Sequence, residues 1–469
     1  MTVLRNDLCS SGSHAAPESL LRLLHLSDAH VMDTLSPARA EWVELLAQDP
    51  HWRPLLHMHR PYEALIMHAL IAHVNKINNA PICPSNGLPF DLVVSTGDNI
   101  DNAQRNELDA YLAAMGGGCA QLDARCGAID PRSGALSGVW PFWDPAGGHQ
   151  NAWRAAGYPS LDNLVDRASE PVRSPGWGVP WTSIAGNHDL LRQGTAITNT
   201  ALERIAVGGL KSLSRPEDFA PNNPLRAFLD TPEKFSDGPG YTIIPHSGRR
   251  VIERQEWANA HADAGALGYR IERAEGQIAN LDRVIDLDHA RLILLDTNHP
   301  HGDYQGSIGT SQLAWLDDRL TEVDQVPGRL AVLISHHGAQ TLTNERGADP
   351  ERRHAASLTA VAHRHRSVVA WLVGHRHINR VTPHPGASGG FWEITTASIV
   401  DWPSQTRAID ISRGTNGSVE ISCTMLDHDA HVDSLANAHR DLARRFAGDA
   451  AARSMSGQPE DRDVRLPVR

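Results

Sequence analysis

Aspartate, asparagine and histidine residues recur in short clusters, and each cluster directly follows a run of apolar residues. The clusters are Asp28-x-His30, Gly97-Asp98-x-x-Asp101, Gly186-Asn187-His188-Asp189, His336-His337 and Gly374-His375-Arg376-His377. Carboxylate, imidazole and amide groups together are typical ligands of Mn, Zn, Fe or Co, whereas Ca prefers oxygen ligands alone. No cysteine lies in these clusters, so the sequence excludes a thiolate site.

The number of candidate ligands indicates how many ions they would hold. One ion takes about three or four protein ligands when one position stays open for water or substrate. Two ions that share a bridging carboxylate use about seven or eight ligands, and such pairs hold the attacking and leaving oxygens of a phosphoryl transfer. The clusters together offer too many ligands for one ion, so they favour two divalent ions and phosphoryl-transfer chemistry.

The apolar runs that precede the clusters predict buried strands. These runs are Leu21–Leu26, Leu92–Val94, Trp181–Ile184, Arg291–Leu295, Leu330–Ile334 and Val368–Val373. Apolar residues at helical spacing predict helices over residues 66–77 and 313–320. Strands that alternate with helices indicate an α/β fold, in which ligands bind beyond the carboxyl ends of the strands. The polar clusters lie at these ends.

Two long segments interrupt the alternation of strands and helices. Residues 103–178 are rich in Gly, Pro and Trp, and residues 190–289 have a mixed composition. Loops of this length inside a compact domain are usually functional, so we expect two insertions that wall or cover the site. Residues 18–430 are expected to form the domain, after a flexible segment 1–17 and before a polar, partly helical tail 431–469 with its helix over 433–446.

Composition excludes several classes of protein. The chain has 469 residues, 41% hydrophobic and 21% charged, which is typical of a globular protein and not of a disordered one. A net charge of −12 argues against a nucleic-acid polymer or an anionic membrane as partner, and no apolar run reaches the roughly 20 residues of a membrane span. The five scattered cysteines and an N-terminus without an apolar leader make the cytoplasm the expected location.

The five clusters, in this order and each after an apolar run, resemble the calcineurin-like metallophosphoesterase superfamily. This resemblance implies a four-layered α/β/β/α sandwich of two facing mixed sheets with helices outside. It implies that one metal ion is held by Asp28, His30, Asp98 and His377. It implies that the other ion is held by Asp98, Asn187, His336 and His375, so that Asp98 bridges the two.

The resemblance also implies catalytic roles for two further residues. His188 would face the substrate phosphate and stabilise or protonate the leaving group, and Asp101 would hydrogen-bond His188. A hydroxide that bridges the ions would attack phosphorus in line. The expected reaction is hydrolysis of a small-molecule phosphodiester. The alternatives are a phosphomonoesterase, a nucleotide or nucleotide-sugar pyrophosphatase, and a non-catalytic scaffold on the same fold.

Several polar residues near the clusters leave alternatives open. His336 is favoured over His337 as ligand because it directly follows the apolar run. Arg376 lies between two expected ligands and either contacts the phosphate or pairs with an acid. His301 and His337 are further candidates for substrate contact. Asp189 is expected to brace its loop.

Overall fold

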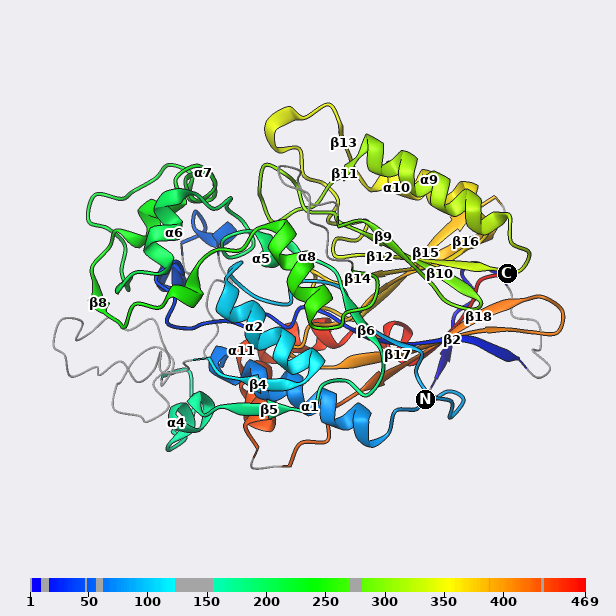
Figure 1. The fold of residues 1–469 in the computed structure, drawn as a ribbon, viewed down its shortest axis with the longest axis horizontal. Coiled ribbons are helices and arrows are strands. Elements are labelled where there is room, and N and C mark those ends of the chain that lie inside the picture. Colours follow the sequence, from blue (N-terminus) through cyan, green and yellow to red (C-terminus); the bar gives the residue numbers. More distant parts are fainter. Residues whose placement is uncertain are drawn as a thin grey trace.

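The computed structural model describes residues 2–9, 17–46, 49–55, 62–122, 155–269, 281–387, 389–431 and 434–469. Two large sheets form its centre (Figure 1). The seven-stranded sheet has the order β1-β19-β18-β17-β2-β3-β6. Its strands are β1 (Val3–Leu4), β2 (Glu18–Leu26), β3 (Leu92–Ser95), β6 (Trp181–Ser183), β17 (Thr406–Arg413), β18 (Val419–Leu426) and β19 (Val464–Pro467).

The six-stranded sheet has the order β15-β16-β14-β12-β10-β9. Its strands are β9 (Arg283–Asp286), β10 (Ala290–Leu295), β12 (Leu330–Ser335), β14 (Val368–Val373), β15 (Arg380–Gly386) and β16 (Gly389–Thr395). Neighbouring strands from β10 to β16 run parallel, and the edge strands β9 and β15 are antiparallel. In the first sheet β2, β3 and β6 are parallel to one another. All six strands predicted from apolar runs are confirmed.

Apolar side chains of both sheets meet in one core between the sheets, where Leu23, Leu292 and Val332 are fully buried. Helices cover the outer faces (Figure 1). The seven-stranded sheet packs against α1 (Ile66–Asn79), α2 (Arg105–Gly116) and α11 (Leu435–Ser456), and the six-stranded sheet packs against α9 (Thr310–Asp324) and α10 (Ala355–Arg364). The predicted four-layered α/β/β/α arrangement is therefore confirmed.

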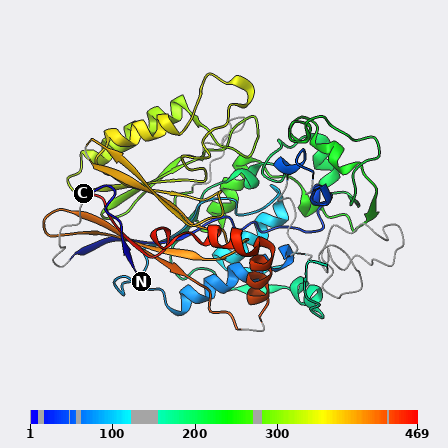
Figure 2. The same ribbon diagram turned by 180° about the vertical axis from the view of Figure 1, so that it is seen from behind.

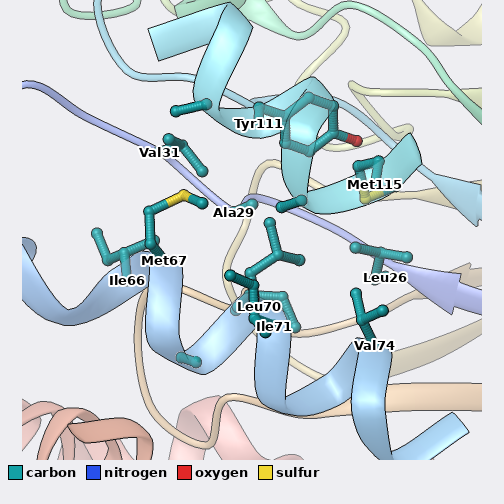
Figure 3. Packing of buried hydrophobic residues seen from close by; sticks show 14 of the residues in the cluster. Leu26, Ala29, Val31, Ile66, Met67, Leu70, Ile71, Val74, Tyr111 and Met115 are labelled. Carbon is teal, nitrogen blue, oxygen red and sulfur yellow. The ribbon is translucent and has the colours of Figure 1, made fainter. Parts of the chain in front are cut away.

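The outer core of the seven-stranded sheet continues into the loop that carries the first predicted ligands. Ala29 and Val31, which flank His30, lie between α1 and α2, where they meet Leu70 and Tyr111 (Figure 3). All four side chains are buried. Because the apolar neighbours of His30 are held in the core, its loop has a fixed path.

The two long insertions contain short elements of their own. Residues 103–178 supply α2, β4 (Gly118–Ala120), α4 (Leu164–Ser169) and β5 (Val172–Ser174), while residues 123–154 lie outside the described part. Residues 190–289 supply α6 (Thr200–Ala206), β7 (Leu210–Ser212), α7 (Pro224–Asp230), β8 (Gly240–Thr242) and α8 (Arg254–Asp263), and end in β9. A short helix α5 (Asn187–Leu190) precedes the second insertion, and β11 (Ile308–Gly309) pairs with β13 (Arg352–Arg353).

Residues 434–469 contain more regular structure than a partly helical tail. Helix α11 (Leu435–Ser456) is interrupted at Gly448, so its first part corresponds to the helix expected over 433–446, and the chain then forms β19, which lies between β1 and β18. Val464 and Leu466 of β19 are fully buried, and this short apolar alternation is hidden in a segment rich in Arg, Asp and Ala. The expected flexible segment 1–17 likewise begins with β1, which pairs with β19. Both ends of the chain thus belong to the sheet.

Among the described residues, no helix has the length and apolar character that crossing a membrane requires.

Candidate metal centre

The predicted ligands follow five parallel strands of the two facing sheets. Asp28 and His30 follow β2, Asp98 follows β3, and Asn187 begins α5 after β6. From the other sheet, His336 follows β12, and the pair His375 and His377 follows β14. Since the carboxyl ends of these strands meet at one edge of the sandwich, ligands far apart in the sequence come together.

Backbone conformation at the ligands is unusual. Five of them have left-handed φ angles: Asp28 (51°), His30 (47°), Asp98 (49°), His375 (65°) and His377 (52°). This conformation is uncommon for residues with a side chain and costs about 1–3 kcal/mol each, and such strain concentrates at functional sites. His30 follows Asp28, and His377 follows His375, at a spacing of i, i+2. The chain turns tightly at both positions, which directs the side chains of both pairs toward the candidate centre.

The first group of donor atoms comes from Asp28, His30, Asp98 and His377. Nε2 of His377 lies 3.2 Å from Oδ1 of Asp28 and 3.2 Å from Nε2 of His30. Nε2 of His30 lies 3.6 Å from Oδ2 of Asp98 and 4.0 Å from Oδ1 of Asp28. Four donor atoms therefore surround one point.

The second group comes from Asp98, Asn187, His336 and His375. Nε2 of His336 lies 3.1 Å from Oδ2 of Asp98 and 3.0 Å from Oδ1 of Asn187. Nδ1 of His375 lies 3.1 Å from the same Asn187 oxygen and 3.2 Å from Nε2 of His336. Oδ2 of Asp98 faces both groups, as a bridging carboxylate must.

The donor chemistry of both groups fits divalent ions. Ligand atoms at about 2.0–2.2 Å from a tetrahedral ion lie about 3.4 Å from one another, which is close to the spacings above. Nε2 atoms of His30 and His377 face each other at 3.2 Å, a gap that two imidazoles fill only by sharing a proton or a metal ion. Asp28 and Asp98 are buried, and among the described residues their ion-pair partners are histidines.

Hydrogen bonds behind the ligands fix the direction of each donor atom. The Nδ1–H of His336 donates to the carbonyl of Thr96 at 2.7 Å, which directs Nε2 toward the second group of donor atoms. The side-chain amide of Asn187 donates to the carbonyl of Gly194 at 2.8 Å and so turns its oxygen toward the second group. The amide N–H of His188 donates to Oδ1 of Asp98 at 2.8 Å, which leaves Oδ2 for the bridge.

Electrostatics at the ligands follow from the buried carboxylates. Burial alone lowers the pKa of His377, but the charges of Asp28 and Asp401 outweigh it and raise the pKa to about 10. The same balance, with Asp98 as the main carboxylate, raises the pKa of His336 to about 9. These imidazoles hold protons that a bound ion would displace, so loading the centre releases protons.

His188 lies beside the two groups, and its ring stands 4.5 Å from that of His30. Its Nδ1–H donates to the backbone carbonyl of Asp101 at 2.8 Å, and the Asp101 carboxylate lies 3.3 Å away. Burial opposes the charged form of His188, but Asp98 and Asp101 outweigh burial and raise the pKa of its imidazole. With Nδ1 held in this way, Nε2 is the ring atom that can exchange a proton with a substrate.

Asp101 contacts His188 as predicted, but mainly through its backbone. Its carboxylate contacts Nδ1 of His30 at 3.0 Å and pairs with the buried guanidinium of Arg39. Arg39 also pairs with Glu41 at 2.9 Å and Glu63 at 3.0 Å. The Asp101 carboxylate therefore orients the expected ligand His30 and is also a neighbour of His188.

The structure distinguishes His336 from His337. Nε2 of His337 lies 3.1 Å from the carbonyl of Tyr304, and its Nδ1 lies 2.8 Å from the hydroxyl of Thr297. Both ring nitrogens of His337 are thus engaged, and burial lowers its pKa to about 3. His336 directs Nε2 to the ligand groups, in agreement with the sequence preference.

The other candidates lie as follows. Arg376 is exposed at the mouth of the site and hydrogen-bonds Gln340 at 2.7 Å. His301 is exposed, contacts His299 and Arg346, and does not line the cavity, so the structure does not bring it to the site. Asp189 accepts the amide hydrogens of Gly186, Asn99 and Ile100, which confirms that it braces the loop.

Sequence reasoning missed Asp401 and Arg39. Oδ2 of Asp401 lies 2.6 Å from Nδ1 of His377, and its other oxygen accepts the hydroxyl of Tyr62. Asp401 lies several residues after the end of β16 (Gly389–Thr395) and does not directly follow an apolar run, unlike the other clusters. Arg39 stands in a segment with no apolar run, and nothing in the sequence points to it.

A cavity of about 660 Å³ opens onto both ligand groups. Its polar side is formed by the centre, including His188, Asn187 and His375, and Arg376 and Arg53 also line it. The volume falls in the range of small-molecule sites.

Comparisons with known proteins give one match in sequence and several in structure. No family model matches the chain. A cAMP/cGMP dual specificity phosphodiesterase of Mycobacterium tuberculosis is 37% identical over 117 residues, which cover 25% of this chain and 35% of that protein. The matched part thus spans about a third of the relative's length.

Solved structures with a similar arrangement include a dimetal phosphatase from Danio rerio, with 12% identity and a TM-score of 0.38 over 88% of this chain and 100% of that one. A purple acid phosphatase from yellow lupin has 9% identity and a TM-score of 0.32 over 88% of this chain and 53% of that one. In its layers and in the order and convergence of its ligand motifs, the chain resembles the calcineurin-like metallophosphoesterases.

Proposed function

We propose that this protein is a metal-dependent phosphoester hydrolase of the calcineurin-like metallophosphoesterase type. The observation that carries the proposal is the pair of four-atom donor groups that share Oδ2 of Asp98. Asp28, His30, Asp98 and His377 would hold one divalent ion, and Asp98, Asn187, His336 and His375 the other. The ions would be Mn, Fe, Zn or Co, since the donors are nitrogen and oxygen atoms.

Two such ions, when bound, supply Lewis acidity at the phosphate and lower the pKa of a water that serves as the nucleophile. The chain's own contribution to the reaction lies in His188 and its surroundings. The Asp101 carbonyl fixes the tautomer of His188, whose Nε2 would donate a proton or hydrogen bond to the leaving oxygen. The Asp98 carboxylate accepts the backbone N–H of His188, and this hydrogen bond fixes the position of the proposed proton donor relative to the proposed bridging ligand.

The substrate class in this proposal is a small phosphodiester. A cavity of about 660 Å³ has room for a substrate larger than inorganic phosphate, and Arg53 and Arg376 supply positive charge on its lining. The matched relative is a cyclic nucleotide phosphodiesterase, which supports a diester over a monoester. A reducing, cytoplasmic location is also part of the proposal, supported by four described cysteines that are all free.

The test is hydrolysis of an aryl phosphodiester and the matching monoester by metal-stripped protein titrated with Mn, Zn, Fe(II), Co and Mg. Diester turnover that saturates at two equivalents of metal is the expected result. Monoester preference would keep the centre and overturn the substrate class. The absence of hydrolysis of both esters with every metal would contradict the proposed enzymatic function and favour a non-catalytic scaffold.

Variants separate metal binding from chemistry. Asp98→Ala should lose both ions and all activity, because its carboxylate belongs to both groups. His188→Ala should keep two ions and lose about 100-fold or more in turnover, as expected for a general acid. Asp109→Ala is a matched control, since this α2 carboxylate is exposed and pairs only with surface Arg105 among the bonds described.

A further inference from the structure

The cavity above the proposed centre is lined by unlike groups. The expected ligands, His188 and further polar side chains such as Tyr304 and Gln193 form part of its lining. Another part comes from α11, which we call the α11 wall: Ala443, Phe446, Ala447, Ala451 and Met455. None of these side chains carries an N–H or O–H group, and only the weakly accepting sulfur of Met455 is polar at all.

A break in α11 lets both of its halves line the cavity. Gly448 has a φ of 69° inside the helix, a left-handed conformation that other residues adopt only with strain. Phe446 and Ala447 precede this break, and Met455 follows it by two turns. Figure 2 shows α11, in red, on the outer face of the seven-stranded sheet.

The α11 wall is fixed relative to the metal ligands at two places. The amide of Asn379, two residues after His377, donates to the carbonyl of Met455 at 2.9 Å. The ring of Phe446 packs edge-on against Tyr62 at 5.8 Å, and the Tyr62 hydroxyl donates to Asp401, the partner of His377. A group that rests on the wall therefore lies at a defined position relative to a phosphate at the centre.

We propose that the substrate is a phosphodiester whose non-leaving ester group is apolar and about the size of an aromatic ring, packed against Phe446 and Met455. This inference rests on the proposed function and specifies its substrate class. An aromatic or thioether surface binds a flat apolar group well. A polyol group would leave its hydroxyls without hydrogen-bond partners on the α11 wall, which costs binding free energy.

The test compares two diesters that have the same leaving group and the same charge: phenyl 4-nitrophenyl phosphate and methyl 4-nitrophenyl phosphate. The protein, loaded with the best metal, should show a kcat/KM at least tenfold higher for the phenyl ester. Phe446→Ala should reduce this ratio about tenfold, and Phe446→Leu should reduce it less. Phe219→Ala is the control, because Phe219 packs against Phe235 and is not among the residues that line the cavity, so the ratio should stay unchanged.

A binding measurement keeps the inference independent of turnover. Phenylphosphonate should bind to the protein at least tenfold more tightly than methylphosphonate by calorimetry, and Phe446→Ala should remove this difference. If neither ester is hydrolysed with any metal, the proposed function fails, and the two phosphonates then decide only whether the apolar subsite on the α11 wall exists. Equal binding of both phosphonates, or equal kcat/KM for both esters, would overturn the apolar subsite. The proposal that the protein is a phosphoester hydrolase would not be affected.

Discussion

The residue Asp401 gives the sharpest test of the metal centre, because it lies behind only one of the two donor groups. Its Oδ2 atom lies 2.6 Å from Nδ1 of His377, whose Nε2 faces Oδ1 of Asp28 at 3.2 Å. A carboxylate in this position orients the imidazole and increases its basicity toward a metal ion. The variant Asp401→Asn keeps the shape of the side chain and removes the charge.

Loss of such a partner typically weakens metal binding about 10–100-fold, which corresponds to about 1.4–2.7 kcal/mol. The described contact of Asp401 with a donor group is the one with His377 of the first group, so the affinity of the second group should stay within about threefold. Asp401→Asn should therefore weaken one of two binding steps and leave the other unchanged. The assay is competition against a chromophoric chelator, with Zn or Mn added to metal-free protein.

Asp410→Asn is the matched control, since Asp410 is also a buried carboxylate but binds the hydroxyls of Ser19 and Ser85. Two unchanged metal affinities in Asp401→Asn would refute the role of Asp401. Equal weakening of both steps would also refute it, because the residue would then act through the fold as a whole.

Three further predictions concern packing and charge. Gly186→Ala should abolish binding of both ions, measured as metal content, because a Cβ there would meet Asp98 Oδ1 at 2.2 Å and its backbone nitrogen at 2.4 Å. Acid should destabilise the fold through four fully buried histidines whose pKa burial lowers to about 3: His25, His73, His261 and His439. The contribution of each histidine to the free energy of unfolding is fully present above pH 6.5 and falls by about 2 kcal/mol at pH 5, because the histidine of the unfolded chain then binds a proton. Urea unfolding at pH 7.5 and at pH 5 measures this loss of stability. The variant His261→Phe should show a smaller loss. Lys211→Met should lower the free energy of unfolding by about 3–5 kcal/mol, since it breaks a fully buried ion pair with Glu41 at 2.9 Å.

Each of these predictions has an outcome that contradicts it. Gly186→Ala protein with two bound ions would mean that the loop yields to a methyl group. An unfolding free energy that is equal at both pH values would mean that the pKa of the buried histidines in the native state is close to that in the unfolded chain. A loss below about 1 kcal/mol in Lys211→Met would mean that the remaining partners of Glu41, such as Arg39, compensate its charge.

Local sequence determined the strands and the positions of the expected metal ligands. The apolar runs before Asp28, Asp98, His336 and His375 are short and bounded by polar residues, and each forms a strand of the predicted sheets. A local apolar run sets where a strand ends, and the carboxyl ends of parallel strands lie at the same edge of a sheet. A residue that directly follows such a run is therefore placed at this edge by its neighbours in the chain.

Only the tertiary structure decided which residues stand behind the ligands and what faces them. Asp401 reaches His377 across 24 residues of chain, Arg39 reaches Asp101 across 62, and α11 reaches the cavity from the far end of the sequence. These contacts depend on how separate elements pack, and no local pattern of residue types encodes them. Each expected ligand motif is a stretch of a few residues that can be recognised locally. The groups that orient these residues and line the cavity come together only when distant elements pack against one another.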